Sequence, residues 1–153
     1  MLDQIEIKKL DHRIGVEFPS PRYASAHAAG LDLVACLDGK IVLPPGQAIL
    51  VGTGIAVHLN DPGYVALIFP RSGNGHKRGM VLGNGTGVID ADYTGELKVS
   101  VLNRSHTEPL TIEPGERIAQ LVITPVVRPE FIWVEDFSAS SDRGSGGFGS
   151  SGK

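Results

Sequence analysis

The chain has 153 residues, of which 20 are glycine and 10 are proline, well above the roughly 12% that these two types contribute to an average protein. A net charge of −3 argues against a general nucleic-acid binder, which needs a basic face for the phosphates. Hydrophobic residues, at 41%, suffice for one core, and no apolar run approaches the ~20 residues of a membrane span. The single cysteine, Cys36, and an N-terminus without signal-peptide character favour a soluble, cytoplasmic protein.

Short β-prone runs alternate with Pro-Gly and Asp-Gly turn signals along the chain. We expect strands over 48–57, 64–69, 97–101, 118–124 and 131–134. The second run is almost entirely apolar and predicts a buried strand, whereas the third alternates like a half-buried one. No stretch longer than ten residues has the apolar spacing of a helix without a glycine or proline, so at most one short helix is expected. The pattern predicts an all-β fold, a jelly-roll-like barrel or sandwich.

Two segments, 43–49 and 112–118, resemble each other in sequence. Each predicts a strand, a tight Pro-Gly turn and a second strand. The similarity fits either two related halves of the fold or two ordinary hairpins.

The last 16 residues contain six serines and five glycines and have almost nothing to bury. We therefore expect one jelly-roll domain over 1–137 and a flexible tail over 138–153. The tail also holds Arg143 and Phe148, which a plain linker does not need. A tail that orders on binding a ligand explains both residues.

Five segments combine glycine with functional groups. The first lies before the apolar run 64–69, and the second follows this run directly. Segment 29–33 places Asp32 on a short apolar strand, with a turn aspartate as the alternative. Segment 70–75 combines Arg71 with a hydroxyl and two glycines at a strand end. Such a group can form an anion cradle or a plain polar loop.

The third segment, 84–96, is the densest in functional groups. Asn84 offers both a donor and an acceptor, as a pyrimidine edge requires. Asp90 can accept a proton from water, and Tyr93 can lie flat on a sugar or base. The pair of Asp90 and Asp92 also fits a metal site, although hard metals often bind through substrate phosphates and waters instead.

The fourth segment, 114–121, is a turn and strand in which Arg117 and Gln120 are the polar exceptions, with a purely structural hairpin as the alternative. The fifth, 143–152, supplies a guanidinium, an aromatic ring, amides and hydroxyls. These groups suit phosphates and a base together. A GxGxxG match at 144–149 lacks the strand and helix that dinucleotide binding requires.

These five segments, in this order, resemble the five motifs of the trimeric, bacterial-type dUTPase family (deoxyuridine triphosphate nucleotidohydrolases), over residues 29–152. The resemblance implies a jelly-roll subunit and a homotrimer with active sites at subunit interfaces. It implies hydrolysis of dUTP to dUMP and pyrophosphate, which limits uracil in DNA and supplies dUMP for thymidylate synthesis. Mg²⁺ would be held mainly by substrate phosphates and waters, with no direct protein ligand. Neither nucleic-acid nor membrane binding is expected.

The resemblance also implies residue roles. Asp90 would activate the water that attacks the α-phosphorus, and Asp32 would act in the metal-water shell or support Asp90 and the phosphates. Tyr93 would pack on the deoxyribose and exclude UTP, and Phe148 would stack on uracil. The uracil-reading groups would be the side chain of Asn84 and the backbone around Gly87, Val88, Ile89 and Lys98. The phosphate-holding residues would be Arg71, Ser72, Gly73, Gln120, Arg143, Ser150 and Ser151.

One departure from the family pattern is Ser151, where a threonine is usual; the hydroxyl is kept. Two other functions compete with dUTP hydrolysis. A related dCTP deaminase would need a glutamate proton shuttle, and Ser100 occupies the equivalent place. A non-catalytic nucleotide-binding or regulatory module could share the fold, because a fold alone does not prove activity.

Overall fold

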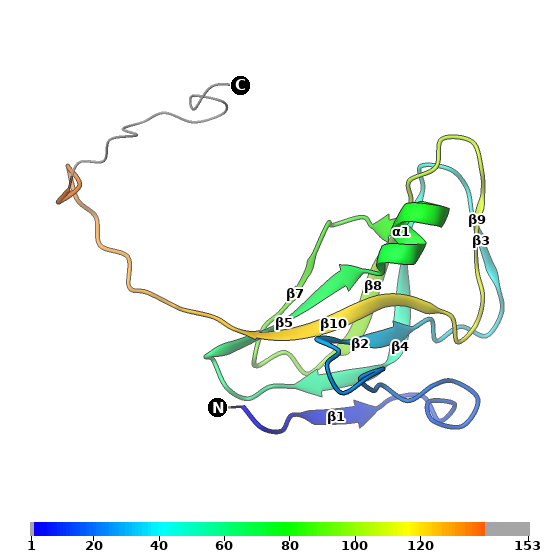
Figure 1. The fold of residues 1–153 in the computed structure, drawn as a ribbon, viewed down its shortest axis with the longest axis horizontal. Helices are drawn as coiled ribbons and strands as arrows, with labels where there is room; N and C mark the ends of the chain where they lie inside the picture. The colour runs from blue at the N-terminus through cyan, green and yellow to red at the C-terminus, as the bar shows by residue number, and fades with distance from the viewer. Residues whose placement is uncertain (1, 140–153) are drawn as a thin grey trace.

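The structure is a computed structural model that describes residues 2–139 (Figure 1). Its only helix in that range, α1, has seven residues, and no described helix is long and apolar enough to cross a membrane. The elements are β1 (Glu6–Lys9), β2 (Gly30–Val34), β3 (Ile41–Leu43), β4 (Ala48–His58), β5 (Tyr64–Pro70), α1 (Ser72–Arg78), β6 (Met80–Leu82), β7 (Gly87–Ile89), β8 (Glu96–Asn103), β9 (Leu110–Ile112) and β10 (Arg117–Pro125).

Two four-stranded antiparallel sheets, β1-β4-β8-β6 and β2-β10-β5-β7, enclose the core, and a two-stranded ribbon, β3-β9, extends from one end (Figure 1). Alternate residues of each strand face the partner sheet, so Leu33 and Leu121 from one sheet meet Val99 and Val101 from the other in a single cluster. This confirms the predicted all-β, jelly-roll-like fold with one short helix.

The two similar segments both form a strand, a turn and a strand, as predicted. Gly46 and Gly115 occupy the turns with φ of 71° and 75°, a region that favours glycine. The turns are not hairpins, because β3 pairs with β9 while β4 pairs with β8 and β10 pairs with β2. Each turn therefore leads the chain from the shared ribbon into a different sheet, which favours two related halves.

Two predicted strands differ from expectation. In β5 only Ala66 and Ile68 are buried, because the other face of the strand lies on the outside of its sheet. Residues 131–134 form no strand: they lie in an extended arm that leaves the body after β10 (Figure 1). A strand needs a neighbour for its backbone hydrogen bonds, and none of the described residues provides one there.

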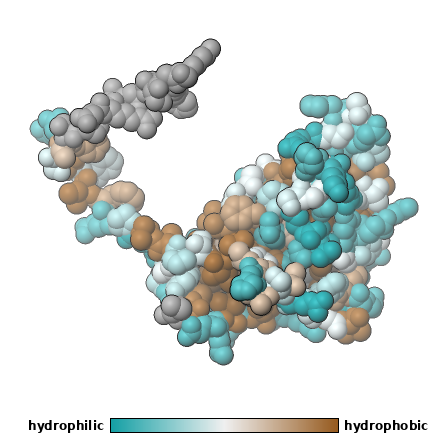
Figure 2. Space-filling view, viewed as in Figure 1, coloured by the Kyte–Doolittle hydropathy of each residue, from teal (hydrophilic) through white to brown (hydrophobic). Residues whose placement is uncertain are grey.

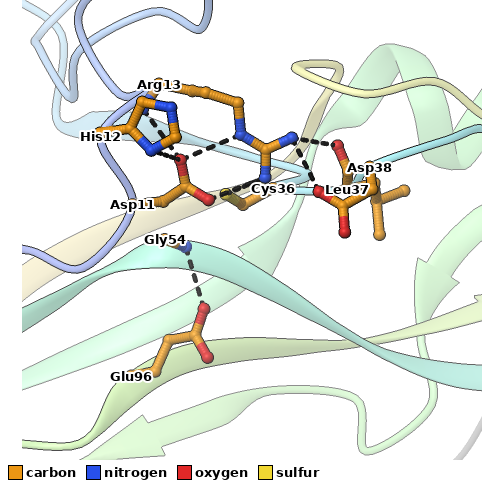
Figure 3. A network of polar contacts seen from close by, with 8 residues as sticks. All are labelled: Asp11, His12, Arg13, Cys36, Leu37, Asp38, Gly54 and Glu96. Carbon is orange, nitrogen blue, oxygen red and sulfur yellow. Dashed lines mark hydrogen bonds and ion pairs between the residues drawn. The ribbon is translucent and has the colours of Figure 1, made fainter.

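A polar network ties the N-terminal segment to the chain after β2 (Figure 3). Arg13 donates to both carboxylate oxygens of Asp11, at 3.0 and 2.7 Å, and to the carbonyl oxygen of Leu37 at 3.0 Å. The hydrogen bonds from Arg13 hold the pKa of Asp11 well below its usual range. Burial, with a further contribution from Asp11, raises the pKa of Cys36 to about 11, so this thiol is neutral and unreactive near neutral pH.

We expect the Asp11–Arg13 pair to make the fold sensitive to acid. Because the pKa of Asp11 is lower in the folded than in the unfolded chain, its stabilisation is present above the ordinary value of 3.8 and is lost as the pH falls below it. Asp11→Asn should therefore lower the free energy of unfolding at pH 7, and its deficit against the wild type should shrink towards pH 2. Urea unfolding followed by circular dichroism across this range measures the difference.

Asp38→Asn is the matched control, because Asp38 also contacts Arg13 but its side chain is 98% exposed. Exposed ion pairs contribute little, so this variant should follow the wild-type pH dependence. Parallel stability profiles for Asp11→Asn and the wild type would contradict the assignment.

Candidate active site

One cluster of polar side chains lies on the outer face of the β2-β10-β5-β7 sheet. Asp32 and Gln120 are paired across β2 and β10, and the residues on both sides of each are buried. Since strand side chains alternate between faces, Asp32 and Gln120 both point away from the core. Gln120 donates through Nε2 to the carbonyl oxygen of Pro70, at 3.0 Å, next to the end of β5.

Two guanidinium groups share the carboxylate of Asp32. Arg71 donates through Nε to Oδ1 at 2.7 Å, and Arg117 donates through Nη1 to Oδ2 at 3.2 Å. Within residues 2–139 the two Nη nitrogens of Arg71 donate no hydrogen bond, so they are available for another anion. A carboxylate that holds two arginines in this way presents a preformed, positively charged site, suited to phosphate.

Helix α1 follows Arg71 directly, so residues 72–78 are helical and the polar-loop alternative is wrong there. Ser72 and Gly73, in its first turn, are exposed. A Cβ placed on Gly73 would meet no atom within 4 Å, so the backbone at this position is open to a ligand. Arg71, Ser72 and Gly73 thus lie together at the end of β5, and their role in binding an anion stays a prediction.

Arg117 was not among the predicted site residues, and a β-bulge brings it there. The register of β10 against β2 shifts between Arg117 and Ala119, so that Ile118 and Ala119 are both buried in succession. The extra residue turns Arg117 to the same outer face as Gln120, although they are three residues apart. The consecutive apolar pair after a turn, which breaks the alternation, is the sequence signal that could have revealed it.

A second cluster lies in the segment that links β6, β7 and β8. β7 pairs with β5 on one side only within the described chain, so its other edge presents free backbone groups that can read a base. Gly87 lets β7 approach β5 closely, because a Cβ there would lie 3.1 Å from Cβ of Ile68. Asn84 is exposed beside this edge and donates to the carbonyl oxygen of Thr86 at 3.3 Å.

Asp90 follows β7 and lines an open cleft of about 600 Å³ together with Val88, Tyr64 and Arg128. Within residues 2–139 its carboxylate accepts no hydrogen bond, so it is free to bind water. Tyr93 follows in a turn, with its N–H donating to the carbonyl oxygen of Asp90 at 3.1 Å.

Lys98 lies further along, on the outer face of β8. Its ammonium group is 4.0 Å from the carboxylate of Glu96. Lys98 is thus the third residue of β8, and its side chain is half-exposed.

The structure does not bring the two clusters together. Ile89 pairs with Ala66, which places Asp90 near the start of β5, whereas Arg71 follows its end. Six residues of strand separate these positions, roughly 20 Å at ~3.3 Å per residue. Arg143, Phe148, Ser150 and Ser151, the predicted tail residues, lie outside the described range.

The described residues contain no group of three or more His, Cys, Asp or Glu side chains placed to hold a metal ion. Both oxygens of Asp32 already accept hydrogen bonds from arginines. The described residues therefore offer no ready-made cage of protein ligands for a divalent cation.

Comparison with known proteins decides the family. A model of the dUTPase family matches residues 16–152. The chain belongs to the dUTPase family. A deoxyuridine 5'-triphosphate nucleotidohydrolase of Tolumonas auensis is 60% identical over 152 residues and covers 99% of both chains. One from Escherichia coli is 56% identical over 153 residues, covering 100% of this chain and 99% of the relative.

Solved structures of dUTPases share the fold. The dUTPase of Staphylococcus bacteriophage 80alpha, in a mutant with bound dUpNHpp, has a TM-score of 0.84 at 32% identity and covers 99% of both chains. A mutant dUTPase from phage phi11 of S. aureus, with a structural Mg(II) ion, has a TM-score of 0.76 at 26% identity over 90% of this chain and 100% of that one. The sequence resemblance to the dUTPase family is therefore confirmed.

Proposed function

We propose that this chain is a dUTP diphosphatase that hydrolyses dUTP to dUMP and pyrophosphate. The observation that carries the proposal is the dUTPase family match over residues 16–152, which spans all five predicted motifs. In the cell this reaction limits uracil incorporation into DNA and supplies dUMP for thymidylate synthesis. The cytoplasm, where deoxynucleotides are made and used in bacteria such as the relatives, is the proposed location.

The proposed active form is a homotrimer with sites shared between chains. The roughly 20 Å of strand between Asp90 and Arg71 in one chain exceeds the length of a triphosphate, which supports a site shared between chains. A neighbouring copy that supplies the missing cluster resolves this distance. Symmetric assembly is the common way to build such a composite site.

The arm after β10 supports the same assembly. Its apolar side chains protrude from the body (Figure 2), with Val127 87% exposed, Phe131 89% and Trp133 102%. Isolated chains rarely expose so many large apolar groups in succession, which indicates burial against a partner. We propose a second copy of this chain as that partner. We also propose that the chain consists of one domain over 1–137 and a tail over 138–153.

The chemistry follows from the two clusters. The Asp90 carboxylate orients the attacking water and accepts its proton, while Arg71, Arg117, Gln120 and the open backbone at Ser72 and Gly73 hold the phosphates. Asp32 fixes both guanidiniums. Mg²⁺, when bound to the phosphates, neutralises part of their charge.

Base and sugar selection belong to the β7 segment and the tail. Asn84, the backbone of Gly87 to Ile89 and that of Lys98 read uracil, and Tyr93 packs on the deoxyribose. From the tail, Phe148 stacks on the base, while Arg143, Ser150 and Ser151 contact the outer phosphates. These roles rest on the family motifs and on the exposed β7 edge.

Arg117→Ala tests the added phosphate contact. Loss of one charge-assisted contact to the triphosphate should raise the KM for dUTP about tenfold. Steady-state pyrophosphate release measures it. Lys40→Ala is the charge-matched control, because Lys40 is exposed at the start of the β3 ribbon and has no polar partner among the described residues. Equal KM values for the two variants would remove Arg117 from the site.

A nucleotide panel tests the activity itself. The protein is incubated with Mg²⁺ and dUTP, dTTP, dCTP or UTP, and the products are separated. We expect dUMP and pyrophosphate from dUTP and little turnover of the others. Ammonia release from dCTP would indicate a deaminase, and binding of dUTP without turnover would indicate a non-catalytic module.

A further inference from the structure

A bulge in β4 lies directly beside the start of β8. The two strands pair in regular register from Ala48 to Gly52 and again at Ala56, with a shift between them. Within the shift, Gly54 has φ of 69°, a conformation that side chains other than glycine rarely adopt. The bulge therefore leaves the Gly54 N–H without a partner from the regular strand ladder.

The side chain of Glu96 fills this bulge (Figure 3). Its Oε1 accepts the hydrogen bond from the Gly54 N–H at 3.0 Å. A Cβ on Gly52 would lie 2.5 Å from the same oxygen, so the carboxylate occupies the space that this glycine leaves free. The position of Glu96 at the start of β8 is thus set by two glycines of β4.

The bulge is also fixed from its other side. The carbonyl oxygen of Gly54 accepts hydrogen bonds from the N–H groups of Leu10 and Asp11, at 2.8 and 3.2 Å. A Cβ on Gly54 would lie 2.8 Å from Sγ of Cys36, so Gly54 packs tightly against the Asp11–Arg13 network (Figure 3). Glu96 therefore binds to a rigid point of the fold.

Tyr93 depends in turn on residue 96. Its hydroxyl donates to the carbonyl oxygen of Glu96 at 3.0 Å. The ring packs on Gly95, where a Cβ would lie 2.5 Å from the Tyr93 oxygen. Tyr93 is 43% exposed, so packing alone holds it only in part.

We propose that Glu96 is a positioning residue for Tyr93, and that selection of the 2′-deoxy sugar depends on the Glu96 side-chain oxygen held in the β4 bulge. The proposal rests on the proposed role of Tyr93 as the residue that excludes a 2′-hydroxyl. A wall rejects one added hydroxyl strongly only if it cannot move aside. The contacts from Gly54 to Glu96 and from Glu96 to Tyr93 give an exposed ring that rigidity.

The test compares kcat/KM for dUTP with kcat/KM for UTP in the full chain. Glu96→Ala should lower the dUTP-to-UTP ratio by about 10- to 100-fold, because a misplacement of about 1 Å can cost up to about 10²-fold. Glu96→Gln should restore the ratio, since its amide oxygen can accept the same Gly54 hydrogen bond. Glu108→Ala is the matched control: Glu108 is exposed in the loop before β9, and its carboxylate has no polar partner in the described chain.

Tyr93→Phe provides a second route that removes only the hydroxyl and leaves the Glu96 anchor in place. It should lower the ratio in the same direction, and the double variant Tyr93→Phe/Glu96→Ala should lose little more than either single one, because both act on one chain of contacts. If Glu96→Ala does not fold, Tyr93→Phe still tests the proposal. An unchanged dUTP-to-UTP ratio in Tyr93→Phe would overturn it.

Two further outcomes distinguish the role of Tyr93 in sugar selection from the role of Glu96 in positioning Tyr93. If Tyr93→Ala leaves the ratio unchanged, the role of Tyr93 in sugar selection fails, and the proposal fails with it. If Tyr93→Ala lowers the ratio but Glu96→Ala lowers only thermal stability, Tyr93 keeps its role and Glu96 is merely structural.

Discussion

Replacing Asp90 by asparagine is expected to lower kcat for dUTP by about 10²- to 10⁴-fold while leaving substrate affinity nearly unchanged. The amide has the size of the carboxylate but cannot take a proton from water. Asp90 is exposed in an open cleft and its carboxylate accepts no hydrogen bond within residues 2–139, so the fold does not depend on its charge. The loss should therefore appear in the chemical step alone.

Single-turnover hydrolysis and equilibrium binding of dUTP separate these two effects. Asp92→Asn is the matched comparison, because Asp92 lines the same cleft two residues away. A water-activating role for one carboxylate predicts that Asp92→Asn keeps most of the activity. Equal losses in both variants would instead favour a metal held by the pair, and normal turnover by Asp90→Asn would contradict its assignment.

Mixing two inactive variants should restore activity if sites are shared between chains. Asp90→Asn and Arg71→Ala each remove one of the two clusters that lie roughly 20 Å apart in a single chain. When the two proteins are unfolded and refolded together in equal amounts, one site in four receives both an intact Asp90 and an intact Arg71 from different chains. About a quarter of wild-type activity should then return.

The control replaces the Arg71→Ala partner with the double variant Asp90→Asn/Arg71→Ala, which should restore nothing. Native mass spectrometry reports whether mixed assemblies form, and light scattering should give three times the 16.2 kDa chain mass. Mixed trimers without recovered activity would place the whole site within one chain.

Much of the fold and part of the candidate site could be predicted from the sequence, because these features depend on local sequence pattern. The alternation over 97–101 predicted β8 and its buried face, since side chains on a strand alternate regardless of what pairs with it. The Pro-Gly turns predicted where strands end, since Gly46 and Gly115 adopt a backbone conformation that few other residues tolerate. The ordered motifs indicated the dUTPase family, and Asp32 was predicted on a short apolar strand.

Other features depended on which strands become neighbours. Arg117 joined Asp32 only through the bulge in β10, because a bulge is a mismatch between two strands and is not visible in one. Pairing of β7 with β5 separated Asp90 from Arg71, although both belong to motifs of one expected site. Residues 131–134 have strand composition but no strand partner in the described chain, so they extend as an arm.

The dUTPase family, the all-β class and the chemistry of the candidate site residues could all be predicted, because turn residues, alternation and functional groups can be identified one residue at a time. The pairing of the strands was needed to show that these residues form two distant clusters, that Asp32 accepts hydrogen bonds from two arginines, and that Glu96 contacts both Gly54 in the β4 bulge and Tyr93. The physical reason is that strand register and bulges arise from backbone hydrogen bonds between segments far apart in the chain.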